Sequence, residues 1–144
     1  MAVKKYLGKI SGPMLDRLDI HVEVPAVQYE ELTGRSDGET SAEIRARVEK
    51  ARALQQARYK GTKVTCNARL TSELMQKYCD VTDDANRILK AAFENLGMSA
   101  RSYDRILKIA RTVADLDGQE KIGASHIAQA IQFRSMDRKY WSEL

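Results

Sequence analysis

One alternating segment near the N-terminus constrains the fold more than any other feature of this sequence. Residues 19–24 read DIHVEV, in which the apolar residues Ile20, Val22 and Val24 alternate with polar ones, and Pro25 follows. A period of two is typical of a half-buried strand, and Pro25 brings no ladder donor, so the strand should end there. No second segment of the sequence has a convincing strand pattern. Because a lone strand leaves its backbone N–H and C=O groups without partners, we expect residues outside this chain, or another chain, to complete its sheet.

The rest of the sequence has helical patterns. Residues 33–40 form a polar, glycine-containing linker, and after it apolar residues recur at helical spacing. Capping residues and glycines predict where the helices begin and end. Helices are expected at 41–59 after the capping-box pair Thr40 and Glu43, after the caps Thr71 and Thr82, between Ser99 and Gly118, and at 125–134, and Gly97 should end the third. Short connections favour an antiparallel bundle, so the predicted fold is mainly α. Residues 41–138 should form this helical domain with 139–144 as a tail, whereas residues 1–32 cannot bury a core and are expected to be poorly ordered.

Three of the predicted helices have a clear apolar face. Apolar residues recur on each with a period near 3.6, as a helix with one buried side requires. The expected core residues are Ile44, Val48, Ala51 and Leu54; then Ala85, Ile88, Leu89, Ala92, Phe93 and Leu96; then Tyr103, Ile106, Leu107, Ala110, Val113 and Ala114.

Composition and motif searches exclude several classes of protein. No apolar run is long enough to span a membrane, and the N-terminal MAVKKYLGKI lacks the apolar region of a signal peptide. Cys66 and Cys79 match no zinc pattern, and two reduced thiols are typical of a cytoplasmic protein, so we expect that location and no metal site. The formal net charge of +4 permits contact with nucleic acid without requiring it. There is no GxxxxGK[ST], GxSxG or HExxH motif, so no self-contained active site is predicted.

Arg17 is the first candidate functional residue. It closes the short helix predicted in GPMLDRLD and stands directly before the predicted strand. A guanidinium on such a support can reach an anion on a neighbouring molecule, as arginine fingers do in phosphoryl transfer. The alternative is an intramolecular ion pair with Asp16 or Asp19, and the local sequence favours neither interpretation.

Arg101 is the second candidate, at the second position after the Ser99 cap. Free N–H groups and the helix dipole both favour an anion there, so an arginine at this position predicts an anion site. Arg105 and Lys108 follow on the same stripe of the helix, with Arg111 at its edge. These three could contact nucleic acid, although a solvated basic face is the more common interpretation of such a stripe.

Three segments together carry a family resemblance that covers nearly the whole chain. ISGPMLDRLDIHVEVP resembles the stretch after sensor 1 in the magnesium-chelatase-like AAA+ ATPases of the ComM/YifB type. SARSYDRILKIARTVADLDG is similar to the sensor-2 helix of that group, and IGASHIAQAIQFRSMD to the end of its lid. The resemblance implies a C-terminal helical lid bundle over 41–138, preceded by a remnant of the α/β nucleotide-binding core over 1–32.

The resemblance also implies roles for the two arginines. Arg17 matches the arginine finger, which would contact the γ-phosphate in the next subunit of a homo-oligomeric, hexameric ring. Arg101 matches the sensor-2 arginine, which would contact the nucleotide from the lid. Family members of this kind are ATP-driven DNA motors, and the ComM type is associated with branch migration in natural transformation. ATP and Mg²⁺ are then expected in the parent protein, with DNA, neighbouring subunits and the AAA+ core of the same polypeptide as partners, and no membrane.

Walker A, Walker B and sensor 1 segments are not found in these residues, so we expect this chain by itself neither to bind ATP tightly nor to hydrolyse it. Two other functions stay open. One is the ATPase subunit of a true magnesium chelatase, which would act in tetrapyrrole synthesis. The other is a free-standing helical module for nucleic acid or protein, with Arg105, Lys108 and Arg111 as its contact surface.

Overall fold

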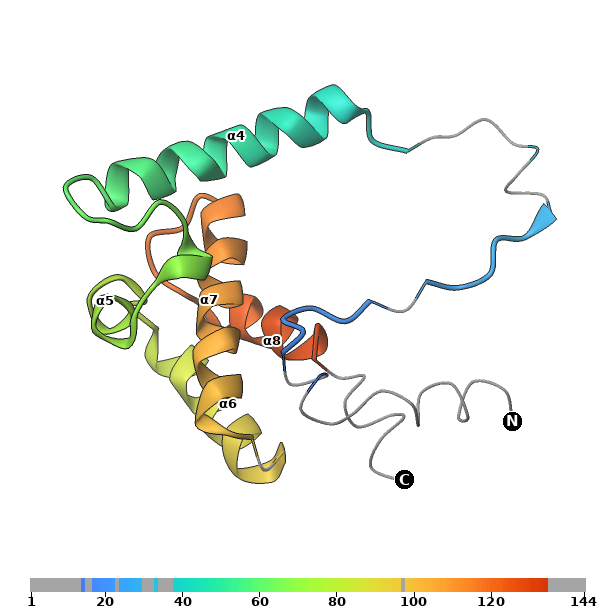
Figure 1. Cartoon of the computed structure of the whole chain (residues 1–144). Coiled ribbons are helices and arrows are strands. Elements are labelled where there is room, and N and C mark those ends of the chain that lie inside the picture. The colour runs from blue at the N-terminus through green and yellow to red at the C-terminus, as the bar shows by residue number, and fades with distance from the viewer. Residues whose placement is uncertain are drawn as a thin grey trace.

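The chain is mainly helical, as predicted. The computed structural model describes residues 14, 17–22, 24–29, 33, 38–96 and 98–134. Its helices are α4 (Ser41–Arg58), the 3₁₀ helix η1 (Asn67–Arg69), α5 (Ser72–Tyr78), α6 (Asp83–Leu96), α7 (Ala100–Leu116) and α8 (Ala124–Gln132). Within these described residues there is no sheet, and a single isolated parallel bridge pairs Val81 with Ile122. Figure 1 shows the helices gathered around α7, with α4 lying across one end of it.

The predicted strand over residues 19–24 is wrong for the described part of that segment. Residues 19–22 and residue 24 lie in no strand. A strand persists only when a neighbouring strand satisfies its backbone groups, and the described residues supply no such neighbour. The segment instead contacts the end of α8, where the His21 N–H donates to the Phe133 carbonyl at 2.7 Å. Residues 1–13 lie outside the described residues, as do 15 and 16 of the short helix expected before Arg17.

Side-chain caps fix where the helices begin, and four of them are confirmed at the predicted residues. Thr40 and Glu43 form a capping box at α4, and the Oγ1 of Thr71 accepts from the Leu74 N–H at 3.4 Å. Thr82 and Ser99 cap α6 and α7 in the same way, at 3.3 and 3.2 Å. Each such cap satisfies one backbone donor that the first helical turn leaves without a partner.

The starts and ends without a hydroxyl cap use other residues. At α8 the ring Nδ1 of His126 accepts from the Gly123 N–H at 2.9 Å, so this histidine caps the start of the helix. Gly118, predicted to mark the end of α7, follows the helix in a left-handed conformation with φ of +67°. Gly97, predicted to end α6, lies outside the described residues.

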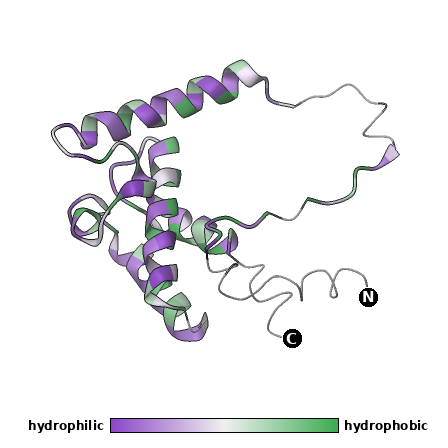
Figure 2. Ribbon diagram, viewed as in Figure 1, coloured by the Kyte–Doolittle hydropathy of each residue, from purple (hydrophilic) through white to green (hydrophobic). Residues whose placement is uncertain are grey.

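The core lies where α6, α7 and α8 meet. α7 packs most extensively against α8 and also contacts α4, η1 and α5, while α6 packs against α8. Figure 2 shows hydrophobic and hydrophilic residues alternating along these helices, as amphipathic helices require. The fully buried apolar residues of the three helices are Ala85, Leu89, Ile106, Ala110, Ala114, Ile127 and Ala130.

The bridge between Val81 and Ile122 ties the start of α6 to the loop before α8. The Ile122 N–H donates to the Asp80 carbonyl at 2.8 Å, and the Thr82 N–H donates to the Ile122 carbonyl at 3.0 Å. Ile122 itself is fully buried. The start of α6 and the loop before α8 are thereby held together by backbone hydrogen bonds.

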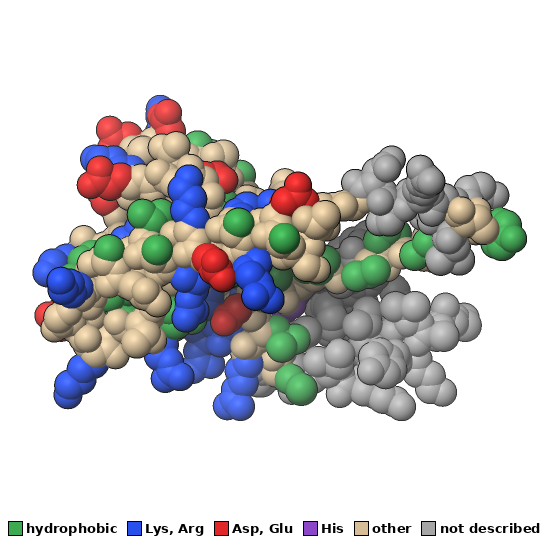
Figure 3. Space-filling model, turned by 90° about the horizontal axis from the view of Figure 1, so that it is seen from above, with side chains coloured by type: hydrophobic (Ala, Val, Ile, Leu, Met, Phe, Trp, Pro, Cys, Tyr) green, Lys and Arg blue, Asp and Glu red, His purple; other side chains and the backbone are tan. Residues whose placement is uncertain are grey.

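Helix α4 packs over only part of its length. Ala51 and Gln55 are buried, but every residue of 41–50 is exposed, including Ile44 and Val48 from the predicted core face. Figure 3, viewed from the α4 side, shows Lys and Arg side chains interspersed with Asp and Glu over this face. Among the described residues, no helix combines the length and the hydropathy that crossing a bilayer requires.

Candidate functional site

The segment that carries Arg17 is held against the helical bundle by its next residues. The Arg17 N–H donates to the Met14 carbonyl at 3.0 Å, which closes a turn, and the Arg17 side chain is exposed. The Leu18 carbonyl accepts from Arg134 Nη1 at 3.0 Å and from Arg105 Nη1 at 3.4 Å. Asp19 Oδ1 lies 3.0 Å from Arg105 Nε. Asp19, one of the two suggested partners of Arg17, is thus paired with Arg105; Asp16 lies outside the described residues.

Arg101 stands on the first turn of α7, directly beyond the Ser99 cap. Its side chain is exposed. The neighbouring Ser102 is buried, and its N–H donates to the Ser99 hydroxyl, so the turn that carries Arg101 is anchored to the bundle. The structure thus places Arg101 on the exposed first turn of α7, and the anion site there stays a prediction.

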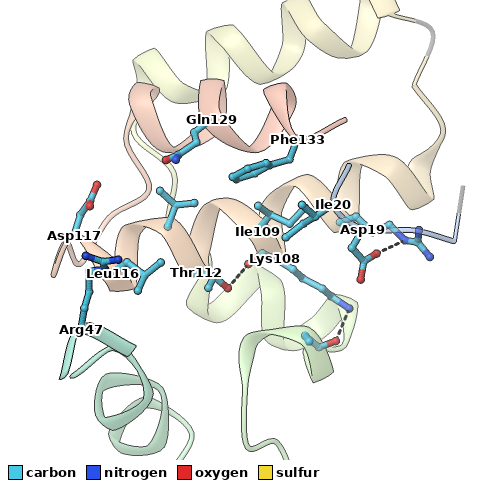
Figure 4. A pocket seen from close by; sticks show the side chains of 13 residues that line it. Asp19, Ile20, Arg47, Lys108, Ile109, Thr112, Leu116, Asp117, Gln129 and Phe133 are labelled. Atoms are coloured by element: carbon cyan, nitrogen blue, oxygen red, sulfur yellow. Dashed lines mark hydrogen bonds and ion pairs between the residues drawn. The ribbon is translucent and has the colours of Figure 1, made fainter. Parts of the chain in front are cut away.

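A cleft of about 770 Å³ opens between the Arg17 segment and the bundle (Figure 4). In Figure 4, Phe133 and Gln129 lie on one side of the cleft and Ile109, Thr112 and Leu116 of α7 on another. The complete lining is Asp19, Ile20, Arg47, Ala68, Arg105, Lys108, Ile109, Thr112, Val113, Leu116, Asp117, Gln129 and Phe133. Arg17 and Arg101 are not among these described lining residues, so the structure does not bring the two arginines together in one pocket.

Arg105 and Lys108 of the predicted basic stripe both make contacts within the chain. The Arg105 side chain is 19% exposed and pairs with Asp19, as described above. Lys108 is half-buried, and its Nζ donates to the Ala68 carbonyl at 3.4 Å. Their proposed contact with nucleic acid stays a prediction.

Arg111 corrects the prediction of a three-residue basic surface. Its side chain is completely buried, with 0% exposure. Its Nη1 and Nη2 donate to the carbonyls of Glu120 and Gln119, and its Nε donates to Asp115 Oδ1 at 3.1 Å. Arg111 lies one turn after buried Leu107 and so belongs to the inner side of α7. A guanidinium in this position cannot form part of a surface that binds nucleic acid.

Sequence reasoning missed a buried polar network around Asp115. Both oxygens of this fully buried carboxylate accept hydrogen bonds from Arg58 of α4, at 2.9 and 2.5 Å. Asn67 Nδ2 donates to Asp115 Oδ2 at 2.8 Å, and Asn67 Oδ1 accepts from the Tyr59 hydroxyl at 2.6 Å. The hydrogen bonds to Asp115 raise the pKa of Arg58 above its usual range, whereas burial lowers the pKa of Arg111 and raises that of Tyr59. The network fixes α4 and η1 to α7.

The two cysteines lie in different environments, and both are free thiols. Cys79 is buried in the core, where desolvation raises the pKa of its thiol to about 11. Cys66 is half-buried. No group of three or more His, Cys, Asp or Glu side chains within the described residues could hold a metal ion.

Comparisons with known proteins place this chain in a family. The family profile described as "Magnesium chelatase, subunit ChlI C-terminal" matches residues 38–134, and "Magnesium chelatase, subunit ChlI" matches residues 1–32. Competence protein ComM of Haemophilus influenzae is 41% identical over 137 residues, which is 94% of this chain and 26% of that protein. The uncharacterized protein YifB of Salmonella typhimurium is 38% identical over 93% of this chain and 26% of its own length. The uncharacterized protein Mb2921c of Mycobacterium bovis is 32% identical over 91% of this chain and also 26% of its own length.

The relatives show how much of a family member this chain covers. The chain spans about a quarter of the length of the curated relatives that it matches. The match covers both the Arg17 segment and the helical bundle, and the predicted resemblance is confirmed. The chain belongs to the magnesium chelatase ChlI C-terminal family and corresponds to the region of that family found in ComM and YifB.

Proposed function

We propose that this chain is the lid and sensor-2 region of a ComM-like AAA+ ATPase. In this function, Arg101 contacts the nucleotide held by its own polypeptide, and Arg17 reaches the γ-phosphate held by the next subunit of a ring. The observation that carries the proposal is the position of Arg101. It is exposed at the capped N-terminus of α7, next to the buried Ser102. The sequence identity of 41% to ComM over 94% of the chain supports the same assignment.

The chemistry proposed for the two arginines is electrostatic. As phosphoryl transfer proceeds, negative charge spreads over the equatorial oxygens of the γ-phosphoryl group, and an arginine supplied from a neighbouring subunit stabilises that charge. Arg101 would add a second guanidinium beside the N-terminal dipole of α7. ATP supplies the phosphoryl group, and Mg²⁺ would neutralise part of its charge. In this proposal the ligands of Mg²⁺ belong to the AAA+ core that holds the triphosphate.

A chain with these groups but without a phosphate-binding loop supplies only part of an ATPase site. We therefore expect no ATP turnover from residues 1–144 by themselves, and turnover when they are joined to a core that holds the triphosphate. The relative named as a competence protein suggests the wider role, in which ATP hydrolysis drives DNA remodelling such as branch migration during natural transformation. A cytoplasmic location fits that role.

A second candidate function is the ATPase subunit of a magnesium chelatase. It is favoured by the description of both matching family profiles, which name that subunit. The same two arginines would then serve ATP hydrolysis coupled to insertion of Mg²⁺ into a tetrapyrrole. The free-standing nucleic-acid module is less well supported, because Arg111 is buried and Arg105 is engaged with Asp19.

A chimera tests the proposal without requiring the parent gene. Residues 1–144 would replace the matching quarter of Haemophilus influenzae ComM, and ATP hydrolysis would be measured with and without DNA. We expect the chimera to hydrolyse ATP and to restore transformation in a strain lacking its own ComM. Arg17→Ala should lower kcat by about 10³-fold, the effect of removing an arginine finger. Arg101→Ala should raise the KM for ATP by about 10-fold, the value of one charge-assisted phosphate contact.

The matched control is Arg87→Ala, which removes an arginine from the exposed pair with Asp84 on α6. It should leave both constants unchanged. An active chimera in which Arg17→Ala and Arg101→Ala behave like Arg87→Ala would contradict the proposed roles. A chimera that hydrolyses ATP and supports tetrapyrrole metallation, but does not restore transformation, would favour the chelatase function.

A further inference from the structure

We propose that Arg105 and Arg134 are positioning residues for Arg17, and that α7 thereby links the two nucleotide contacts of the subunit. Arg105 lies on α7 and Arg134 follows the end of α8, and both donate to the carbonyl of Leu18, the residue after Arg17. The structural part of this inference stands independently, whereas its effect on ATP hydrolysis rests on the function proposed above for Arg17 and Arg101.

Four contacts hold the chain on the C-terminal side of Arg17. Two of them are the guanidinium donations to the Leu18 carbonyl, at 3.0 Å from Arg134 and 3.4 Å from Arg105. The third is the ion pair of 3.0 Å between Arg105 Nε and Asp19 Oδ1. The fourth is the backbone bond of 2.7 Å from the His21 N–H to the Phe133 carbonyl. Residues 18–21 are therefore attached both to α7 and to the end of α8.

The two arginines in these contacts are more buried than those of a typical surface ion pair. An exposed pair of Arg and Asp contributes little stability, because both groups are well solvated. Here Arg134 is only 8% exposed and the Arg105 side chain only 19%, whereas the Asp19 side chain is 60% exposed, so the burial is on the arginine side of these contacts. Two guanidiniums that donate to one backbone carbonyl from different directions restrict both its direction and its distance. The planar fork of arginine suits this arrangement, and the single ammonium of lysine does not reproduce it.

Because Arg105 lies on α7, it connects the helix that carries Arg101 to the segment that carries Arg17. Arg101 and Arg105 lie about one helical turn apart, and a helix moves over that distance as a rigid body. If Arg101 draws the start of α7 toward a nucleotide, Arg105 carries the Leu18 carbonyl with it, and Arg17 moves by a similar amount. A displacement of about 1 Å at a catalytic group can change a rate by about 10²-fold. Occupancy of one nucleotide site would in this way set the position of the arginine offered to the next.

Hydrogen exchange on the full chain tests the structural part. The His21 amide should be protected, because it donates to Phe133. The double variant Arg105→Ala/Arg134→Ala should accelerate its exchange by at least 10-fold while amides in the centre of α7 keep their protection. Asp19→Asn is a second variant that leaves the helical bundle untouched and should give a smaller acceleration. Unchanged exchange at His21 in both variants would overturn the inference, and Arg87→Ala is the control that should change nothing.

Steady-state kinetics of the ComM chimera test the catalytic part. Arg105→Ala/Arg134→Ala should lower kcat by about 10- to 100-fold with the KM for ATP unchanged, as expected when a transition-state group is misplaced. Placing Lys instead of Ala at position 134 of this double variant should not restore kcat, because the ammonium of lysine lacks the guanidinium fork. If Arg17→Ala costs activity and the double variant does not, the positioning inference is wrong although the proposed function stands. If Arg17→Ala itself has no effect, the proposed function fails, and only the exchange experiment then decides whether the contacts hold residues 18–21.

Discussion

Arg111 and Asp115 form a completely buried ion pair one turn apart on α7, with Nε and Oδ1 separated by 3.1 Å. Arg58 of α4 pairs with the same carboxylate, whose side chain has no exposed surface. Two positive groups thus share one negative group in the interior, and the carbonyls of Gln119 and Glu120 take up further donors of Arg111. This arrangement ties the helix after the linker to the helix that carries Arg101.

Removing the shared charge should be severely destabilising. We expect Asp115→Asn to lower the free energy of unfolding by about 3–5 kcal/mol, because two arginines would lose their compensating carboxylate in a buried site. Chemical denaturation of the full chain measures this directly. Asp84→Asn is the control: Asp84 pairs with Arg87 on the surface of α6, and its loss should cost less than about 1 kcal/mol. Equal effects of the two substitutions would show that the buried network contributes nothing special.

The stability of the chain should fall at alkaline pH through Cys79. Burial raises the pKa of this thiol from 9.0 to about 11. Below pH 9 the thiol is protonated in both states, so its contribution is fully present. Between these values the unfolded chain releases the proton and the folded chain keeps it, so stability is lost as the pH rises. We expect a decrease of about 1–2 kcal/mol from this residue.

Urea denaturation at pH 8 and pH 10.5 checks the role of Cys79. The difference between the two pH values should be smaller in Cys79→Ala than in the parent chain, whereas Cys66→Ala should leave it unchanged. Burial also raises the pKa of Tyr59, so part of the decrease should remain in the Cys79 variant. A pH dependence identical in all three proteins would contradict the assignment.

Neighbouring apolar residues on α6 should differ strongly in their contribution to stability. Leu89 is 1% exposed and Ile88 is 37% exposed, although both belong to the predicted core face. We expect Leu89→Ala to cost about 2–5 kcal/mol, the range for a buried leucine, and Ile88→Ala to cost less than half as much. Thermal and chemical denaturation of the two single variants provide the comparison. Comparable losses would show that the exposed part of this face is covered in solution.

Local features of the fold could be predicted from the sequence, because they depend on residues close together in the chain. Thr40, Thr71, Thr82 and Ser99 each cap the next helix within three residues. The periodic faces of α6 and α7 likewise follow from a regular repeat of 3.6 residues. The helices α4 to α8 and their order can therefore be predicted from the sequence.

Features that depend on distant residues could not be predicted in this way. Periodicity gives the apolar side of α4, but it does not show that packing is confined to the C-terminal half of the helix, which leaves Ile44 and Val48 exposed. The alternation at 19–24 suggested a strand, yet a strand also needs a partner, and the described residues contain none. The spacing of Arg111 and Asp115 is visible in the sequence, but their burial depends on Arg58, which is 57 residues away from Asp115.

The candidate site also combines residues that local sequence can indicate with contacts that it cannot. The sequence singled out Arg17 and Arg101 through local context, a turn before an extended segment and a capped helix start. It could not reveal that Arg105 and Arg134 meet at the Leu18 carbonyl, because that contact joins residues separated by 87 and 116 positions. The interpretation of Arg105 as a surface residue for nucleic acid overlooked this internal use.

Complementation between two inactive proteins tests the central proposal most directly. One protein is the ComM chimera with Arg17→Ala, and the other is the chimera with its phosphate-binding loop disabled, so neither should hydrolyse ATP. Mixed in equal amounts, they should form rings in which about one interface in four combines an intact loop with an intact Arg17, and turnover should reappear. Arg17→Ala that stays fully active by itself, or an inactive mixture whose subunits demonstrably co-assemble, would contradict an arginine acting on the nucleotide of the neighbouring subunit.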